Sequence, residues 1–264
     1  MDEGYLPTKA RRIGVLLGCT AILLAACTAR GDHTQPIPTV LFPAPDAAQR
    51  LVVVLPGRVD DLASLRRSGV VGTIHRHWPD ADVVLAELTM SYYLDGDAPR
   101  KLHEQVIAPA RGRGYAEVWV AGASLGGMGG IMYDRAYPGE LDGIVLLAPY
   151  LGEPPILREI ARDGGITQWD PGPRQDISAG NWQREMWRHL QSWSVDPERT
   201  RNIWLAYGRR DRLRSSMPAL ASLLPDGNVL VRPGGHSWQV WSPALGEALE
   251  AASARGRTKV RGQP

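Results

Sequence analysis

The sequence contains little cysteine, little histidine and no marked excess of charge of either sign. Its two cysteines, Cys19 and Cys27, among 264 residues exclude a disulfide framework and a thiolate metal site, and we expect no metal. The 30 basic residues nearly balance 28 acidic ones, so a net charge of +2 gives no reason to expect nucleic acid as a partner. A hydrophobic content of 44% suits one medium-sized domain with a full core.

Residues 1–26 have the organisation of a bacterial signal peptide. Arg11 and Arg12 precede an uncharged apolar run over 13–26, which is too short to span a bilayer comfortably. The run ends in Leu24-Ala25-Ala26-Cys27, which resembles a lipobox, the motif in which the cysteine receives lipid and becomes the first mature residue. A plain signal peptide and an uncleaved anchor are the alternatives.

The lipobox interpretation predicts an exported protein of the cell envelope, attached to a membrane only through lipid on Cys27. Cys19 would be removed with the signal, so Cys27 would be the one cysteine left in the mature chain. Thr28 follows Cys27 where an aspartate tends to retain lipoproteins at the inner membrane. The absence of an aspartate at this position favours the outer membrane if the host has one.

Composition divides the rest of the chain into three parts. Residues 27–48 are rich in proline, threonine and alanine, and are predicted to form a tether with one short strand at 40–42. Residues 49–252 are predicted to form the domain. Residues 253–264 carry several basic side chains and are predicted to be a disordered tail.

Apolar runs of strand length alternate with helical stretches throughout the domain. Strands that are apolar on both faces are typical of a parallel sheet covered by helices on two sides. The pattern therefore predicts an α/β fold, a doubly wound and mostly parallel sheet of about six to seven strands. The expected strands are 51–55, 83–86, 118–121, 144–148, 203–207 and 229–231, and the expected helices are 61–75, 98–113, 125–137, 215–224 and 242–253.

One stretch, residues 150–196, interrupts this alternation. It is punctuated by proline and glycine, it is rich in tryptophan, and it is predicted to contain helices over 155–162 and 181–193. An insertion here would project over the carboxyl edge of the sheet, where it could act as a short helical lid or a substrate wall. The tryptophans could equally pack the insertion onto the domain, and the two roles are compatible.

A serine motif stands between an expected strand and an expected helix. Gly122-Ala123-Ser124-Leu125-Gly126 follows the run that ends at Ala121. A serine on such a sharp turn projects its hydroxyl from the sheet edge, and the helix N-terminus favours negative charge developing there. A small-residue turn with an ordinary N-cap serine is the plainer interpretation.

An acid and then a base follow the serine along the chain. Asp211 comes just after the strand at 203–207, and His236 lies in a glycine-rich loop after the strand at 229–231. Because parallel strands end at one edge of the sheet, both side chains are expected near Ser124.

These motifs resemble those of the α/β-hydrolase superfamily, most closely small bacterial esterases. The similarity covers about Leu51 to Leu249 and includes Leu55-Pro56-Gly57-Arg58 and the serine motif. Pro233-Gly234-Gly235-His236-Ser237-Trp238, with the later Trp241, is similar to esterases that have a Gly-His-x-Trp-x-x-Trp ending. The resemblance implies hydrolysis of carboxylic-ester or related acyl bonds in a small-molecule or lipid-like substrate, without a cofactor.

The resemblance assigns Ser124 as nucleophile, His236 as base and Asp211 as the acid that orients it. The amide of Leu125, directly after the nucleophile, is expected to be one oxyanion donor. The other is expected from the loop after the first strand, where Arg58 is the first choice and Gly57 the second. This loop lacks the His-Gly-Gly of many lipases, which leaves the second donor less defined.

Two other functions fit the same residues. An acyltransferase or a peptidase would use the same triad, because the nucleophile chemistry is shared. A catalytically inactive hydrolase fold could also act as a binding lipoprotein, although the presence of all three triad residue types argues mildly against that.

Overall fold

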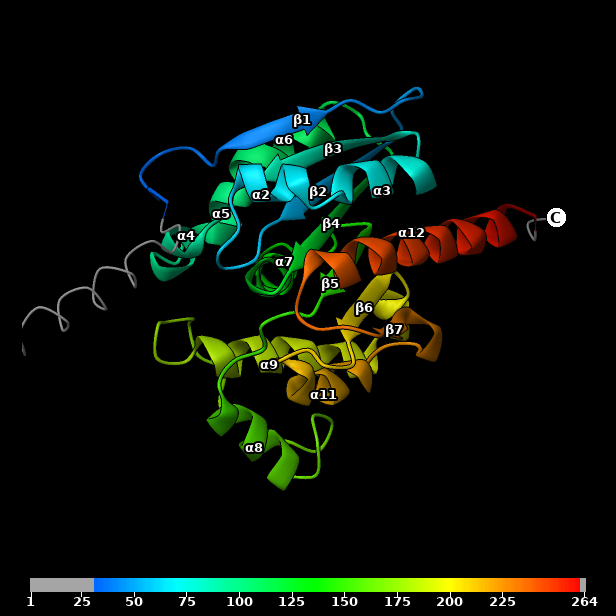
Figure 1. The fold of residues 1–264 in the computed structure, drawn as a ribbon. Helices are drawn as coiled ribbons and strands as arrows, with labels where there is room; N and C mark the ends of the chain where they lie inside the picture. Colours follow the sequence, from blue (N-terminus) through cyan, green and yellow to red (C-terminus); the bar gives the residue numbers. More distant parts are fainter. Residues whose placement is uncertain (1–30, 262–264) are drawn as a thin grey trace, which may run out of the picture.

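The apolar runs of the sequence become the strands of one sheet. The computed structural model describes residues 31–261, and its seven strands lie in the order β1-β3-β2-β4-β5-β6-β7 (Figure 1). β1 pairs antiparallel with β3, and every other neighbouring pair is parallel. This confirms the predicted α/β fold class. The strands are β1 Thr39–Phe42, β2 Arg50–Leu55, β3 Ala81–Ala86, β4 Glu117–Ala123, β5 Gly143–Leu147, β6 Ile203–Gly208 and β7 Val229–Arg232.

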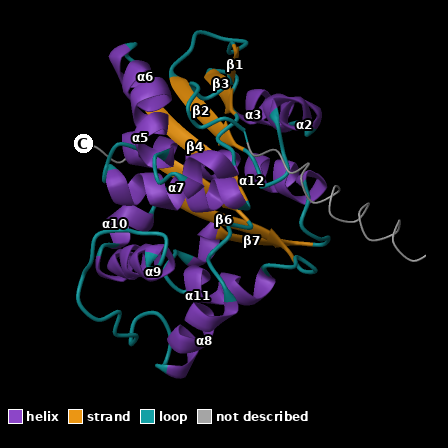
Figure 2. Cartoon of the chain, turned by 90° about the vertical axis from the view of Figure 1, so that its left-hand side faces the viewer, coloured by secondary structure: helices purple, strands orange, loops and turns teal. Residues whose placement is uncertain are grey.

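Helices cover both faces of the sheet, which explains why its central strands are apolar throughout. α2, α3 and α12 lie on one side, and α5, α6 and α7 lie on the other (Figure 2). Val52, Val53 and Val54 of β2 are therefore buried on alternate faces. The helices are α2 Leu62–Arg67, α3 Val70–His77, α4 Met90–Leu94, α5 Ala98–Leu102, α6 Ala108–Gly112, α7 Leu125–Ala136, α8 Pro154–Arg162, α9 Trp182–Ser192, α10 Pro197–Thr200, α11 Met217–Ala221 and α12 Trp238–Arg261, with shorter turns η2 His103–Ile107, η3 Trp193–Val195, η4 Arg214–Ser216 and η5 Asp226–Asn228.

Several helix boundaries differ from the predicted ones. The helix expected over 61–75 is broken into α2 and α3 by Gly69, whose φ of 78° is a left-handed conformation that interrupts a helix. The helix expected from residue 242 begins at Trp238, and Pro243 lies inside it. α12 also continues to Arg261, because Ala251, Ala252 and their neighbours extend it, so most of the predicted disordered tail is helical.

More of the predicted tether contacts the domain than its composition suggests. Ile37 is buried, and its amide donates to the side chain of Gln105. The hydroxyl of Tyr92 donates to the carbonyls of Gln35 and Pro36, and β1 adds to the sheet edge. Cys27 and the predicted signal peptide lie outside the described residues. Between residues 31 and 261, no helix combines the length and the apolar character that crossing a membrane requires.

The insertion over 150–196 packs onto the domain through its aromatic side chains. Trp169, Trp187 and Trp193 are each at most 2% exposed and belong to the core cluster that includes Leu125 and Met128 of α7. The indole N–H of Trp187 donates to the carbonyl of Leu151. These tryptophans therefore have the packing role considered for them, whereas a mobile lid remains a prediction.

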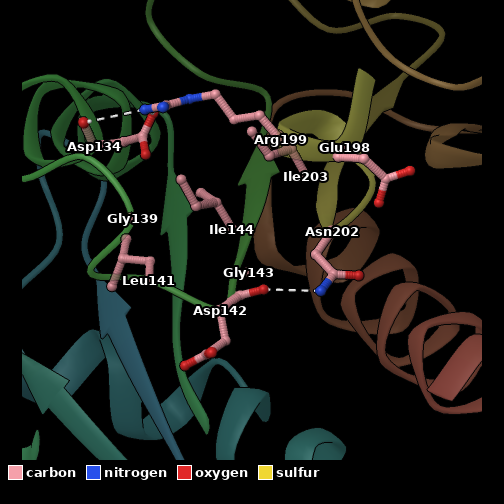
Figure 3. A pocket seen from close by; sticks show the side chains of 10 residues that line it. All are labelled: Asp134, Gly139, Leu141, Asp142, Gly143, Ile144, Glu198, Arg199, Asn202 and Ile203. Carbon is pink, nitrogen blue, oxygen red and sulfur yellow. Dashed lines mark hydrogen bonds and ion pairs between the residues drawn. The ribbon is translucent and has the colours of Figure 1, made fainter. Parts of the chain in front are cut away.

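A buried carboxylate joins α7 to the insertion and to the segment that follows it. Asp134 Oδ2 lies 2.8 Å from both His189 Nε2 and Arg199 Nη2. Burial by itself raises the pKa of Asp134, but the hydrogen bonds from His189 and Arg199 outweigh it and lower that pKa below its ordinary value. Asp134 and Arg199 also line a pocket at the amino-terminal ends of β5 and β6, the sheet edge opposite the end of β4 that precedes Ser124 (Figure 3).

Removing the Asp134 carboxylate should destabilise the fold. Asp134→Ala leaves Arg199 and His189 without their partner, so we expect the free energy of unfolding to fall by about 3 kcal/mol in urea denaturation at neutral pH. The pKa of Asp134 is lowered in the fold. The stabilisation from its ionised carboxylate is therefore complete above the ordinary carboxyl pKa of 3.8, and it is lost as the pH falls below that value. The difference from wild type should therefore narrow in acid.

The matched control is Glu198→Ala, which removes a carboxylate that is 84% exposed and paired with Arg201. A change of at most about 0.5 kcal/mol is expected there. Equal losses for the two variants would show that the Asp134 contacts contribute no special stability.

Candidate active site

Ser124 occupies a strained turn between β4 and α7. Its φ of 51° and ψ of −108° are rare for a residue with a side chain, and such strain costs about 1–3 kcal/mol. The backbone around it is fixed by three hydrogen bonds: its amide donates to the carbonyl of Leu147, and its carbonyl accepts from the amides of Met128 and Tyr150. Strand β5 and helix α7 together thus hold the strained serine in place.

The glycines around Ser124 are required by close backbone packing. A Cβ on Gly122 would lie 2.1 Å from the carbonyl oxygen of Gly126. A Cβ on Gly126 would lie 2.5 Å from the carbonyl oxygen of Leu55 in β2. Since both obstacles are backbone atoms, neither position can accept a side chain without distortion. The Gly-x-Ser-x-Gly spacing therefore reflects how closely α7 approaches β4 and β2.

Asp211 and His236 meet at the carboxyl-terminal edge of the sheet. The Nδ1 atom of His236 lies 2.8 Å and 2.9 Å from the two carboxylate oxygens of Asp211. Asp211 is fully buried, and its Oδ1 also accepts from the amide of Leu213. Because the carboxylate of Asp211 can only accept a hydrogen bond from Nδ1, it favours the tautomer of His236 with a proton on Nδ1 and a lone pair on Nε2.

The other nitrogen of His236 has no hydrogen-bond partner among the described residues. Nε2 is buried and makes no hydrogen bond to any described residue, Ser124 included. Catalytic hydrogen bonds are often long in the absence of substrate and tighten when it binds. The ring is held by Trp241, which packs edge-on against it with 4.7 Å between ring centroids. The three predicted residues follow β4, β6 and β7, which all end at this edge.

Two amides near Ser124 are free to act as donors. The amide of Leu125, the first residue of α7, and the amide of Arg58, in the loop after β2, make no hydrogen bond to a described residue. The amide of Gly57 is different, because it donates to Asp60 Oδ2 at 3.0 Å. Of the two predicted second donors, Gly57 thus has its amide occupied in this conformation, whereas the amide of Arg58 is free.

Sequence reasoning missed Asp60. Its Oδ2 atom also accepts from the indole N–H of Trp238 at 3.0 Å, so it joins two loops that border the site. The motif Asp60-Asp61 gave no signal for this role, because either aspartate could cap the following helix. The structure shows that Asp61 is the N-cap of α2.

No three His, Cys, Asp or Glu side chains between residues 31 and 261 are grouped so that they could hold a metal ion.

Comparisons with known proteins bear on the family and the fold. A family model described as "Putative esterase" matches residues 106–252, which is more than half of the chain. No curated protein matches the sequence. The structure is similar to Est1E from Butyrivibrio proteoclasticus, with a TM-score of 0.57, 14% identity and coverage of 83% of this chain and 93% of that one.

Two structures from Staphylococcus aureus are also similar. The S-formylglutathione hydrolase FrmB has a TM-score of 0.51 and 14% identity, with coverage of 77% of this chain and 80% of that one. The fluorophosphonate-binding serine hydrolase F has a TM-score of 0.51 and 14% identity, with coverage of 81% of this chain and 98% of that one. At these identities the similarity establishes the fold alone.

A substitution at Gly122 tests whether the close approach of β4 and α7 excludes a side chain from the turn. Gly122→Ala should lower the free energy of unfolding by more than about 3 kcal/mol, because the new Cβ meets the backbone of Gly126, and esterase activity should be lost with it. Gly112→Ala is the control, since Gly112 is in α6 and a Cβ there would meet no atom within 4 Å apart from its chain neighbours and its own helix. Urea denaturation and hydrolysis of p-nitrophenyl butyrate measure both effects. A Gly122→Ala protein as stable and active as Gly112→Ala would contradict the packing argument.

Proposed function

The chain belongs to the esterase family and is an enzyme of the α/β-hydrolase class, and from this we propose that it cleaves carboxylic esters through Ser124, His236 and Asp211. The observation that carries the proposal is the His236–Asp211 contact at the same sheet edge as a serine in a strained elbow. A buried acid that orients a histidine, with the far nitrogen free, is the arrangement needed to activate a hydroxyl.

The reaction follows from the positions of these groups. Ser124 Oγ attacks the ester carbonyl while His236 Nε2 takes the hydroxyl proton, and Asp211 stabilises the resulting imidazolium. His236 then gives the proton to the departing alcohol, which leaves an acyl group on Ser124. Water, deprotonated by the same nitrogen, attacks this acyl-enzyme, and the acid is released as Ser124 regains its proton.

The charge that develops on the carbonyl oxygen requires preorganised donors. The amides of Leu125 and Arg58 are the candidates, because both are unpaired and both flank the nucleophile. Leu125 also begins α7, whose N-terminus favours negative charge. Each donor stabilises the transition state by about 3 kcal/mol in comparable sites.

Ser124→Ala tests the nucleophile. Turnover of p-nitrophenyl butyrate should fall by on the order of 10³-fold or more, because no other group at the site can form the acyl-enzyme. Ser222→Ala, at an exposed serine after α11, is the control and should retain wild-type rates. Unchanged turnover in Ser124→Ala would contradict the proposed mechanism.

We further propose that the protein is exported and held in the cell envelope by lipid on Cys27. The support is the lipobox-like Leu24-Ala25-Ala26-Cys27. The described chain begins at Gly31, packed against Thr89 and Ser91 beyond the carboxyl end of β3. Residues 28–31 can extend at most about 14 Å, so such an anchor would hold the edge that carries Ser124 near the lipid surface.

Replacing Cys27 by serine tests the anchor. Without the thiol no lipid can be attached, so Cys27→Ser should leave the membrane fraction, or accumulate unprocessed, in a bacterial host that carries out lipoprotein maturation. Cys19→Ser, inside the predicted signal, is the control and should fractionate like wild type. An unchanged membrane fraction for Cys27→Ser would argue for a different kind of attachment.

A further inference from the structure

A single carboxylate oxygen connects the two loops that border Ser124. Asp60 Oδ2 accepts from the amide of Gly57 and from the indole N–H of Trp238, each at 3.0 Å. Gly57 belongs to the loop after β2, whereas Trp238 begins α12 directly after the loop of His236. Asp60 is half-buried, and its own amide donates to the carbonyl of Gly57, which closes a tight turn.

On one side, this carboxylate fixes the candidate oxyanion loop. A Cβ at Gly57 would lie 2.9 Å from Asp60 Oδ2 and 3.8 Å from the Cβ of Ser124, so the glycine is enclosed between the aspartate and the nucleophile. Asp60 holds the peptide planes on both sides of Gly57, because its carboxylate accepts from the Gly57 amide and its own amide donates to the Gly57 carbonyl, which shares a plane with the amide of Arg58. The free amide of Arg58 follows directly in the chain.

On the other side, the same carboxylate reaches the histidine through two aromatic rings. Trp238 packs edge-on against Trp241 with 5.4 Å between centroids, and Trp241 packs edge-on against His236 at 4.7 Å. The indole N–H held by Asp60 sets the orientation of the first ring. Asp60 thus makes no hydrogen bond to the imidazole or to Ser124, but it is linked through Gly57 and Trp238 to both parts of the site.

We infer that Asp60 is a positioning residue for ester hydrolysis, which locks the Arg58 amide and the His236 ring into one arrangement around Ser124. This inference rests on the proposed function of Ser124 and His236. Both donors to Asp60 are uncharged N–H groups, so the contact is not an ion pair. Capping does not account for Asp60 either, because Asp61 is the residue that caps α2. A carboxylate with two such donors fixes geometry, as preorganised sites require.

The experiment compares four variants of the full chain with p-nitrophenyl butyrate as substrate. Asp60→Ala removes both hydrogen bonds to the side chain. It should lower kcat by about tenfold to a hundredfold and change KM by less than about threefold, because the lost positioning weakens stabilisation of the transition state more than substrate binding. Asp60→Asn keeps an acceptor oxygen and should recover most of kcat. Trp238→Phe breaks one contact and should lower kcat by less than Asp60→Ala does.

Asp61→Ala is the matched control. It removes the same charge from the next residue and loses the cap of α2, which costs about 1 kcal/mol of stability, but it leaves the contacts of Asp60 intact. Its kcat should remain within about twofold of wild type. A loss of kcat in Asp61→Ala equal to that in Asp60→Ala would show a general effect of charge or stability and would overturn the inference.

A readout without catalysis separates this inference from the proposed function. Among the 9 tryptophan indole N–H signals of a ¹H–¹⁵N spectrum, the one absent in Trp238→Phe should shift in Asp60→Ala, and the Gly57 amide should exchange faster with solvent. Unchanged turnover in Ser124→Ala would defeat the proposed function while leaving these signals as predicted. An unmoved indole signal, or wild-type kcat in Asp60→Ala, would overturn the role of Asp60.

Discussion

The site depends on how closely α7 approaches the sheet at the end of β4. The chain passes from strand to helix within a single residue, which forces Ser124 to a positive φ and brings Gly122 and Gly126 against backbone atoms. The strain is held by hydrogen bonds from β5 and from the first turn of α7. Without those neighbours the serine would relax, and its hydroxyl would lose its fixed position at the sheet edge.

Two loops that follow Ser124 along the chain complete the arrangement. The loop after β6 contributes the buried Asp211, and the loop after β7 contributes His236, whose Nδ1 atom the carboxylate holds. Since β4, β5, β6 and β7 are consecutive and parallel in the sheet, these loops all lie at the same edge. We propose that ester hydrolysis follows from this convergence, whereas the substrate depends on the surrounding loops.

The sequence predicts structural features that come from repeated patterns or from residues close together in the chain. Apolar runs such as that of β2 identify parallel strands, and the Gly-x-Ser-x-Gly motif identifies the elbow because close packing excludes side chains there. It does not predict the break at Gly69, because a glycine inside a helical pattern is often tolerated. Nor does it predict that Asp60 bonds to Trp238, which lies 178 positions away, because no local pattern encodes that contact.

The most direct test of the central claim is covalent labelling by a fluorophosphonate, followed by mass spectrometry to map the modified residue. A hydroxyl activated by His236 and Asp211 should react at once, so the account predicts a single phosphonylated residue, Ser124, and no labelling after His236→Ala. A protein that stays unlabelled, or that is labelled at another serine, would contradict it.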